Sequence, residues 1–161
     1  MLPKLLLTVF AIPALLFVAG VSGLLFHAWP TKWPDENITL KPPQLERLRA
    51  LQRERKFVQD MRLHYPGAPN EGLRIALEKR VNGAIDRIAQ GIQDNPRKSF
   101  VLGTFKQLLA DTQTLDSEER DRLLNYFEQI MVILDIRSSN ELLNVWRYGF
   151  PYGWFMSSSR S

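Results

Sequence analysis

Hydrophobic and polar residues divide the chain into two parts. Residues 5–26 include no charged side chain, and Thr8 and Ser22 are the most polar among them. As an α-helix, about 22 residues are enough to cross the hydrocarbon layer of a bilayer. From residue 44 onward, apolar side chains instead recur every three or four positions among charged ones, which is typical of amphipathic helices. The pattern predicts an all-α protein: a single N-terminal transmembrane helix followed by a five-helix bundle domain.

Five helices are expected in the bundle, and no alternating strand pattern of useful length interrupts them. Asn70 is a favourable N-cap for the second helix. Asp116 to Glu119 and Ser138 to Glu141 have the spacing of capping boxes for the fourth and fifth helices. The expected positions are 44–63, 71–93, 97–111, a helix that opens at Asp116, and a helix that opens at Ser138 and stops at Gly149.

The predicted organisation has four parts. They are a transmembrane signal-anchor (1–27), a Pro-rich linker (28–43), the helical bundle (44–149) and an aromatic, Ser-rich tail (150–161). Prolines in the linker fix their own backbone and disfavour helix before them, so this segment is expected to be extended.

The N-terminal segment has two readings. A cleaved secretory signal would have a shorter apolar core and a small-x-small cleavage site, to which 18–20 and 21–23 are poor matches. Trp29 and Trp33 after the apolar run instead fit an interfacial aromatic belt, which favours an uncleaved anchor. Counting positive charges on the two flanks would put the domain in the cytoplasm. The short basic leader around Lys4 favours the opposite orientation, a single-pass inner-membrane protein with a periplasmic C-terminal domain.

Composition narrows the range of functions. The chain has no cysteine, which excludes disulfides, thiol nucleophiles and thiolate metal sites. Its net charge is +4, and residues 35–110 carry 14 Lys/Arg against 9 Asp/Glu, whereas residues 111–161 carry 5 against 8. The domain is therefore basic in its first half and acidic in its second. Because no dense basic face stands beside aromatic or Gly-rich elements, no nucleic-acid partner is predicted.

Two groups of residues are candidates for binding a partner. Arg49, Arg53 and Lys56 fall on one side of the first expected helix, where they form either a solvated face or a surface for an acidic partner or lipid phosphates. The aromatic residues of the tail either fold back as a lid or form an exposed contact surface. These tail residues are Tyr152, Trp154 and Phe155.

No catalytic set emerges from the sequence, so the protein is not predicted to be an enzyme. His64 is the one histidine of the predicted bundle, and it stands near no recognisable nucleophile or metal-ligand motif. Glu118, Glu119 and Asp121 cluster in a first helical turn, where the helix dipole favours acids. The glycines are isolated and form no phosphate-binding loop. No cofactor and no metal ion are therefore predicted.

Two local patterns carry a resemblance. The first is Tyr65-Pro66-Gly67 followed by the helix that contains Arg74. The second runs from Tyr126 to Met131 and continues through 138–150. Together they resemble a family of small bacterial all-helical domains of unknown function, over about residues 44–151, to which the N-terminal anchor is an addition. The resemblance implies a helical fold and no activity.

Three functional hypotheses remain. The first is a membrane-tethered, non-enzymatic protein-binding domain, for example an immunity-type protein that neutralises a toxin in the periplasm. The second is an accessory or assembly subunit of a cell-envelope complex that uses the anchor itself for contacts. The third is a lipid-binding protein or minor hydrolase with a pocket between helices. The sequence identifies neither the partner nor the oligomeric state.

Overall fold

The computed structural model describes residues 12–18, 20–21, 35–110, 112 and 114–148. Between residues 35 and 148, the described chain forms five α-helices and one short 3₁₀ helix, which confirms the all-α class. The elements are α2 (Pro42–Arg53), η1 (Met61–Leu63), α3 (Glu71–Gly91), α4 (Lys98–Ala110), α5 (Ser117–Ile133) and α6 (Leu142–Tyr148).

Part of the N-terminal apolar segment is also described. Residues 12–18 and 20–21 are helical, and their side chains are exposed. No helix within the described ranges combines the length and the hydrophobicity needed to cross a membrane. The rest of the expected anchor (1–27) and the whole tail (150–161) lie outside the described residues.

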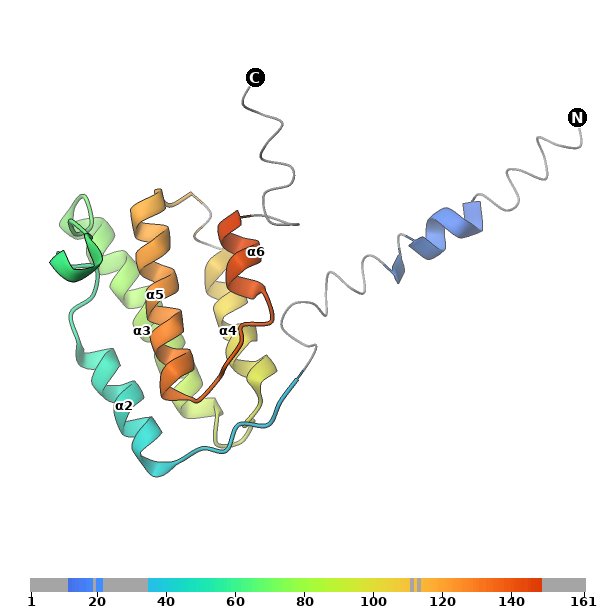
Figure 1. Cartoon of the computed structure of the whole chain (residues 1–161), viewed down its shortest axis with the longest axis horizontal. Coiled ribbons are helices and arrows are strands. Elements are labelled where there is room, and N and C mark those ends of the chain that lie inside the picture. Colours follow the sequence, from blue (N-terminus) through green and yellow to red (C-terminus); the bar gives the residue numbers. More distant parts are fainter. Residues whose placement is uncertain (1–11, 19, 22–34, 111, 113, 149–161) are drawn as a thin grey trace, which may run out of the picture.

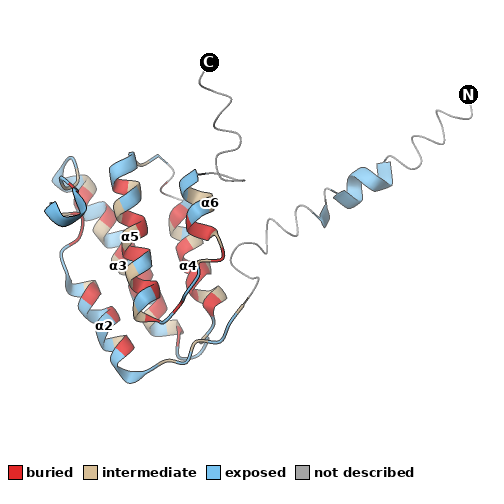
Figure 2. Ribbon diagram, in the orientation of Figure 1, coloured by how far each residue is buried: buried red, intermediate tan, exposed pale blue. Residues whose placement is uncertain are grey.

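The longest helix, α3, is the centre of the bundle. It packs against α2, α4 and α5, while α2 also contacts α5 and α6 packs on α4 (Figure 1). The inward faces of these helices are buried (Figure 2). Phe105 and Phe127 stack in the core with ring centroids 4.2 Å apart. The apolar face predicted for α3 is confirmed, because Val81, Ile85 and Ile88 are fully buried.

Of the three N-terminal helix caps predicted from the sequence, one forms as expected and two do not. Asn70 caps α3, since its side-chain oxygen accepts a hydrogen bond of 2.9 Å from the Leu73 N–H. Asp116 occupies the N-cap of α5 but makes no side-chain capping hydrogen bond. The expected capping box at Ser138 is wrong. Asn140 and Glu141 adopt positive φ angles of 49° and 69°, so α6 begins only at Leu142.

Residues 35–41 do not form a free linker. Asp35 caps α4: its carboxylate accepts hydrogen bonds of 2.8 Å from both the Ser99 N–H and the Ser99 hydroxyl. Ile38 donates its N–H to the Pro96 carbonyl at 2.7 Å. Lys41 pairs with Asp135, just beyond the end of α5, at 2.6 Å. The chain therefore joins the bundle at the end that holds the start of α4 and the end of α5.

Two glycines of α3 provide a matched test of this packing. A Cβ added at Gly83 would meet nothing within 4 Å, whereas one added at Gly91 would lie 2.5 Å from Cζ of Phe100. We expect Gly83→Ala to stabilise the fold by about 1 kcal/mol, because alanine is the better helix former. Gly91→Ala should destabilise it by about 1–3 kcal/mol through overpacking against the ring. Urea unfolding of the full chain in nonionic detergent, followed by circular dichroism, measures both. Equal effects of the two substitutions would contradict this account.

Candidate functional site

The segment between α2 and α3, called here the 54–70 loop, is the least regular part of the described domain. Asp60 and Tyr65 pair through their backbones, with N–O distances of 2.9 and 3.0 Å, and η1 forms the tip between them. The prediction of one helix over 44–63 is therefore wrong. The helix ends at Arg53, and Glu54 after it has an extended backbone.

The side chain of Lys56 explains why α2 ends there. Its ammonium group donates hydrogen bonds to the carbonyl oxygens of Leu51 at 2.5 Å, Glu54 at 2.9 Å and Gln52 at 3.3 Å. These bonds give the Gln52 and Glu54 carbonyls a donor at the end of the helix, and they add a second donor to the Leu51 carbonyl, which also accepts from the Glu54 N–H at 3.3 Å. Lys56 is 0% exposed, so the predicted basic stripe is wrong at this position. Burial lowers the pKa of its ammonium group, and the carboxylates of Glu78 and Glu54 oppose that shift.

Two residues of α3 hold the loop backbone at Lys56. The Glu78 carboxylate accepts a hydrogen bond of 2.5 Å from the Lys56 N–H. Arg74 donates to the Lys56 carbonyl at 3.1 Å and to Glu78 at 2.8 Å. Burial raises the pKa of Glu78, but the hydrogen bonds from Lys56 and Arg74 outweigh it and hold that pKa below its usual value. Glu78 therefore remains a carboxylate at neutral pH.

Phe57 is held in a strained backbone conformation. Its φ angle is 56°, in the left-handed region that aromatic residues rarely adopt. Its N–H donates to the Tyr126 hydroxyl at 3.0 Å, and its fully buried ring meets the Tyr126 ring edge-on at 5.2 Å. Such a conformation costs roughly 1–3 kcal/mol and persists only where surrounding contacts enforce it. The 54–70 loop is therefore held in one shape by contacts from α3 and α5.

Arg122 of α5 fixes the far side of the same loop. Its guanidinium lies over the rings of Tyr65 and Tyr126, with centroid distances of 5.5 and 5.0 Å. It also forms an ion pair of 3.2 Å with Asp60. Lys56 turns inward toward the end of α2, so the cation that pairs with Asp60 is Arg122.

Tyr65 has an unusual buried hydroxyl. The residue is 5% exposed, and its hydroxyl lies next to the carboxylate of Glu119, which is 2% exposed. Burial raises the pKa of Tyr65, and the Glu119 carboxylate raises it further. The hydroxyl therefore stays protonated at neutral pH. Tyr65 and Glu119 form a buried polar pair between the 54–70 loop and α5.

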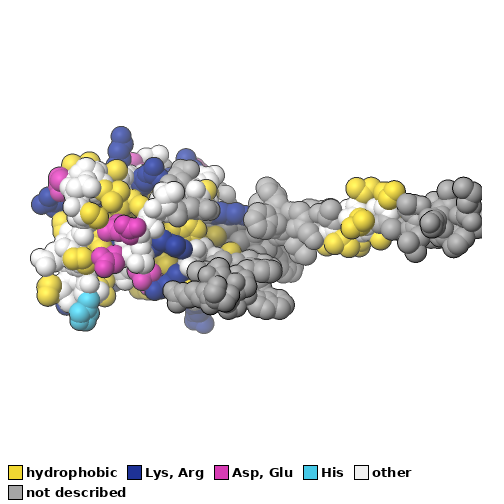
Figure 3. All heavy atoms as spheres, turned by 90° about the horizontal axis from the view of Figure 1, so that it is seen from above, with side chains coloured by type: hydrophobic (Ala, Val, Ile, Leu, Met, Phe, Trp, Pro, Cys, Tyr) yellow, Lys and Arg dark blue, Asp and Glu magenta, His cyan; other side chains and the backbone are white. Residues whose placement is uncertain are grey.

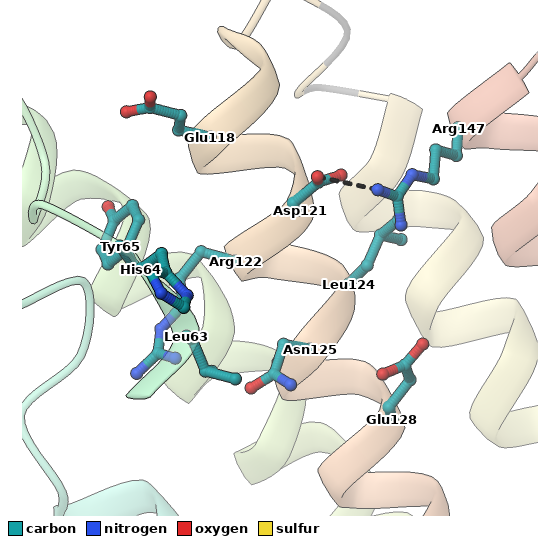
Figure 4. A pocket seen from close by; sticks show the side chains of 10 residues that line it. All are labelled: Leu63, His64, Tyr65, Glu118, Asp121, Arg122, Leu124, Asn125, Glu128 and Arg147. Atoms are coloured by element: carbon teal, nitrogen blue, oxygen red, sulfur yellow. Dashed lines mark hydrogen bonds and ion pairs between the residues drawn. The ribbon is translucent and has the colours of Figure 1, made fainter. Parts of the chain in front are cut away.

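The 54–70 loop and α5 enclose a cleft of about 330 Å³, called here the hairpin cleft. Arg147 of α6 reaches in and pairs with Asp121 at 2.7 Å (Figure 4). Glu118 and Glu128 also line the cleft, are exposed, and form no ion pair with any other described residue. The lining residues are Leu63, His64, Tyr65, Glu118, Asp121, Arg122, Leu124, Asn125, Glu128 and Arg147.

Two apolar side chains project from the tip of the loop beside this cleft. Met61 is 73% exposed and Leu63 is 50% exposed. The space-filling view onto this end of the bundle shows acidic side chains among apolar ones (Figure 3). A fixed apolar tip next to a charged cleft is an arrangement suited to contact with another molecule.

The comparisons with known proteins fit this architecture. The domain of unknown function DUF4844 matches residues 39–151. The chain belongs to the DUF4844 family. The resemblance expected for 44–151 is thereby confirmed at the level of a small domain of unknown function. None of the curated proteins compared with this DUF4844 chain matches it.

A solved structure shares the fold. It is a DUF3571 family protein from Acinetobacter baumannii AYE, with 25% sequence identity and a TM-score of 0.61. The match covers 71% of the DUF4844 chain and 95% of that chain. The A. baumannii chain therefore consists almost entirely of the matched region.

The structure separates the predicted binding residues. Arg49 and Arg53 are exposed on α2, apart from buried Lys56. His64 lines the hairpin cleft as the residue that ends η1, with a φ angle of 52°. Tyr152, Trp154 and Phe155 lie outside the described residues.

Sequence reasoning missed the exposed tip and the buried role of Arg122. The signal that could have found the tip was the Pro66-Gly67 turn. Gly67 adopts a φ of 98° and closes the loop below the apolar pair. Nothing comparable in the sequence marks Arg122, whose partners Asp60 and Tyr65 lie more than fifty positions away along the chain.

Replacing Lys56 tests whether its ammonium group holds the loop. Lys56→Met keeps the apolar stem but removes the ammonium group that donates to the carbonyls of Leu51, Gln52 and Glu54, so we expect a loss of about 2–4 kcal/mol in the free energy of unfolding. Arg53→Met, an exposed change at the end of the same helix, should alter it by less than about 0.5 kcal/mol. Urea unfolding in nonionic detergent measures both variants. A Lys56→Met protein as stable as Arg53→Met would show that the capping bonds do not hold the loop.

Proposed function

We propose that this chain is a membrane-tethered protein-binding domain without catalytic activity, and that the hairpin cleft with its apolar tip is the binding site. The observation that carries the proposal is the exposure of Met61 and Leu63 on a loop that buried charges hold in one shape. Protein interfaces commonly combine an apolar centre with a polar rim and are enriched in Met and Arg.

The rigidity of the loop favours binding over a role as a flexible connection. Contacts from Glu78, Tyr126 and Arg122 fix the backbone on both sides of the tip. A surface that is already ordered loses less conformational entropy when a partner docks. The apolar tip would gain contact area at a low ordering cost, which supports recognition of a folded partner.

The proposed tether is the apolar segment 5–26, whose length and flanking tryptophans support a single-pass anchor with the domain on the periplasmic side. The segment that starts at Asp35 attaches to the bundle near Asp135, just beyond the C-terminal end of α5. The α5 residues that line the hairpin cleft, Glu118 to Glu128, lie roughly 10–25 Å from Asp135 at 1.5 Å per residue. A tethered domain of this kind can present the cleft away from its attachment point.

A concrete form of the proposal is an immunity-type protein that binds a toxin in the periplasm. The alternative is an accessory subunit of an envelope complex that makes its contacts through the anchor. Replacing residues 5–26 by an unrelated membrane helix distinguishes them. Partner binding survives this exchange if the cleft binds the partner, and is lost if the anchor does.

Membrane attachment has a direct test. We expect the full chain to remain in the membrane pellet after an alkaline carbonate wash. Leu15→Arg/Leu16→Arg should release it, because an arginine near the centre of a membrane helix costs about 2.5–3.5 kcal/mol of insertion free energy. Leu15→Ala/Leu16→Ala is the matched control and should stay in the pellet. A wild-type protein recovered from the soluble fraction and trimmed near residue 23 would refute the anchor.

The binding role of the tip is tested by affinity purification of the full chain from detergent extracts of its own cells. The double variant Met61→Asp/Leu63→Asp should recover at least about 30-fold less of a stoichiometric protein partner than the wild type. This is the effect expected for the loss of one interface hot spot. Folding should be preserved because both side chains are exposed. Val132→Asp, at a residue 74% exposed near the other end of α5, is the matched control.

Two results would count against this role. One is the recovery of no stoichiometric protein by the wild type. The other is an equal loss of the partner in Val132→Asp, which would place binding elsewhere on the domain.

A further inference from the structure

The charges around the hairpin cleft do not cancel. Arg122 is neutralised by Asp60 at 3.2 Å, and Arg147 is neutralised by Asp121 at 2.7 Å. Glu118 and Glu128 line the same cleft, and neither forms an ion pair within the described part of the chain. The charge left over in the cleft is therefore negative.

The wall of the cleft adds a second feature. Tyr65 lines the cleft and is 5% exposed, and its hydroxyl lies next to the carboxylate of Glu119, which is 2% exposed. The buried carboxylate therefore adds negative charge behind this wall. Ammonium and guanidinium groups, which carry three and five N–H donors and no acceptor, suit such a surface.

The tip of the loop supplies the apolar part of the surface. Leu63 lines the cleft, and Met61 stands two residues before it on the same 3₁₀ helix. Exposed methionine makes adaptable contacts with apolar side chains. The surface as a whole therefore offers apolar contact next to an acidic recess.

We propose that the hairpin cleft takes a basic segment of a partner protein, with lysine or arginine side chains beside Glu118 and Glu128 at the two ends of the cleft (Figure 4) and a neighbouring apolar side chain against Met61 and Leu63. This inference rests on the proposed protein-binding function and adds the chemistry of the partner. Charge complementarity selects this occupant, since carboxylates in the recess attract a cationic chain and repel an anionic lipid surface.

The four methionines of the chain allow a direct test by NMR of the full chain in nonionic detergent, with ¹³C-labelled methionine methyl groups. Met61 reports on the cleft, and Met131, which is 8% exposed in the core, is an internal control. The probes are three short peptides, acetyl-Leu-Arg-Leu-amide and its counterparts with glutamine or glutamate in place of arginine. They share their apolar side chains and differ only in charge.

We expect the arginine peptide to shift the Met61 signal at millimolar concentration and leave Met131 unmoved. The glutamine peptide should bind at least fivefold more weakly, and the glutamate peptide should produce no shift. Glu118→Gln/Glu128→Gln should weaken binding of the arginine peptide about fivefold, as expected for the loss of one exposed charge pair. Glu46→Gln/Asp94→Asn, which removes two exposed acids elsewhere, should leave its affinity unchanged.

The other outcomes separate the two proposals. Equal Met61 shifts with all three peptides would overturn the charge preference and leave the apolar protein-binding surface standing. Met61 shifts that appear only with anionic lipid vesicles, or only on raising the protein concentration, would overturn both in favour of a lipid surface or a second copy. A Met61 signal that no probe moves would also overturn the basic-segment proposal, even if the affinity purification yields a partner.

Discussion

The buried ammonium group of Lys56 is the interaction on which the rest of the site depends. A fully buried lysine is costly unless its charge is compensated, and here the three N–H donors meet three carbonyls while Glu78 and Glu54 supply opposite charge. These bonds end α2 and turn the backbone inward. Without that turn, the chain would continue as a helix and the cleft beside α5 would not exist.

The turn brings together groups that stabilise one another. Phe57 keeps its left-handed backbone because its N–H meets the Tyr126 hydroxyl, and the same hydroxyl accepts from Nε of Arg122 at 3.2 Å. Arg122 in turn holds Asp60 at the base of the tip. Buried polar networks of this kind are rigid only when each member is satisfied. Tyr65, whose ring lies under the Arg122 guanidinium, joins this network to the wall of the cleft.

The sequence predicts the parts of this fold that depend on local pattern. In α3, apolar residues at helical spacing and an asparagine cap fix both the buried face and the start of the helix. The end of α2 has no such signal, because the apolar period runs on to Met61 and neither Gly nor Pro interrupts it. The contacts that hold the chain beyond the end of the helix come from the Lys56 side chain and from Glu78 and Arg74, some twenty residues further along the chain. The attachment of 35–41 likewise depends on distant partners, Ser99 and Asp135.

The fold explains why the first half of the domain sequence is basic and the second half is acidic. Several basic residues of the first half form ion pairs within the fold. Examples are Arg74 with Glu78 and Arg97 with Asp35, the latter at 2.9 Å. On α5, the charges nearest the loop are likewise used internally. The carboxylates that remain, Glu118 and Glu128, are those that face the cleft, so the acidity of the second half is concentrated where the fold also exposes its apolar tip. Folding stability gains nothing from that coincidence, because exposed apolar groups and unpaired exposed charges contribute little to it. Recognition of a partner gives both features a physical role.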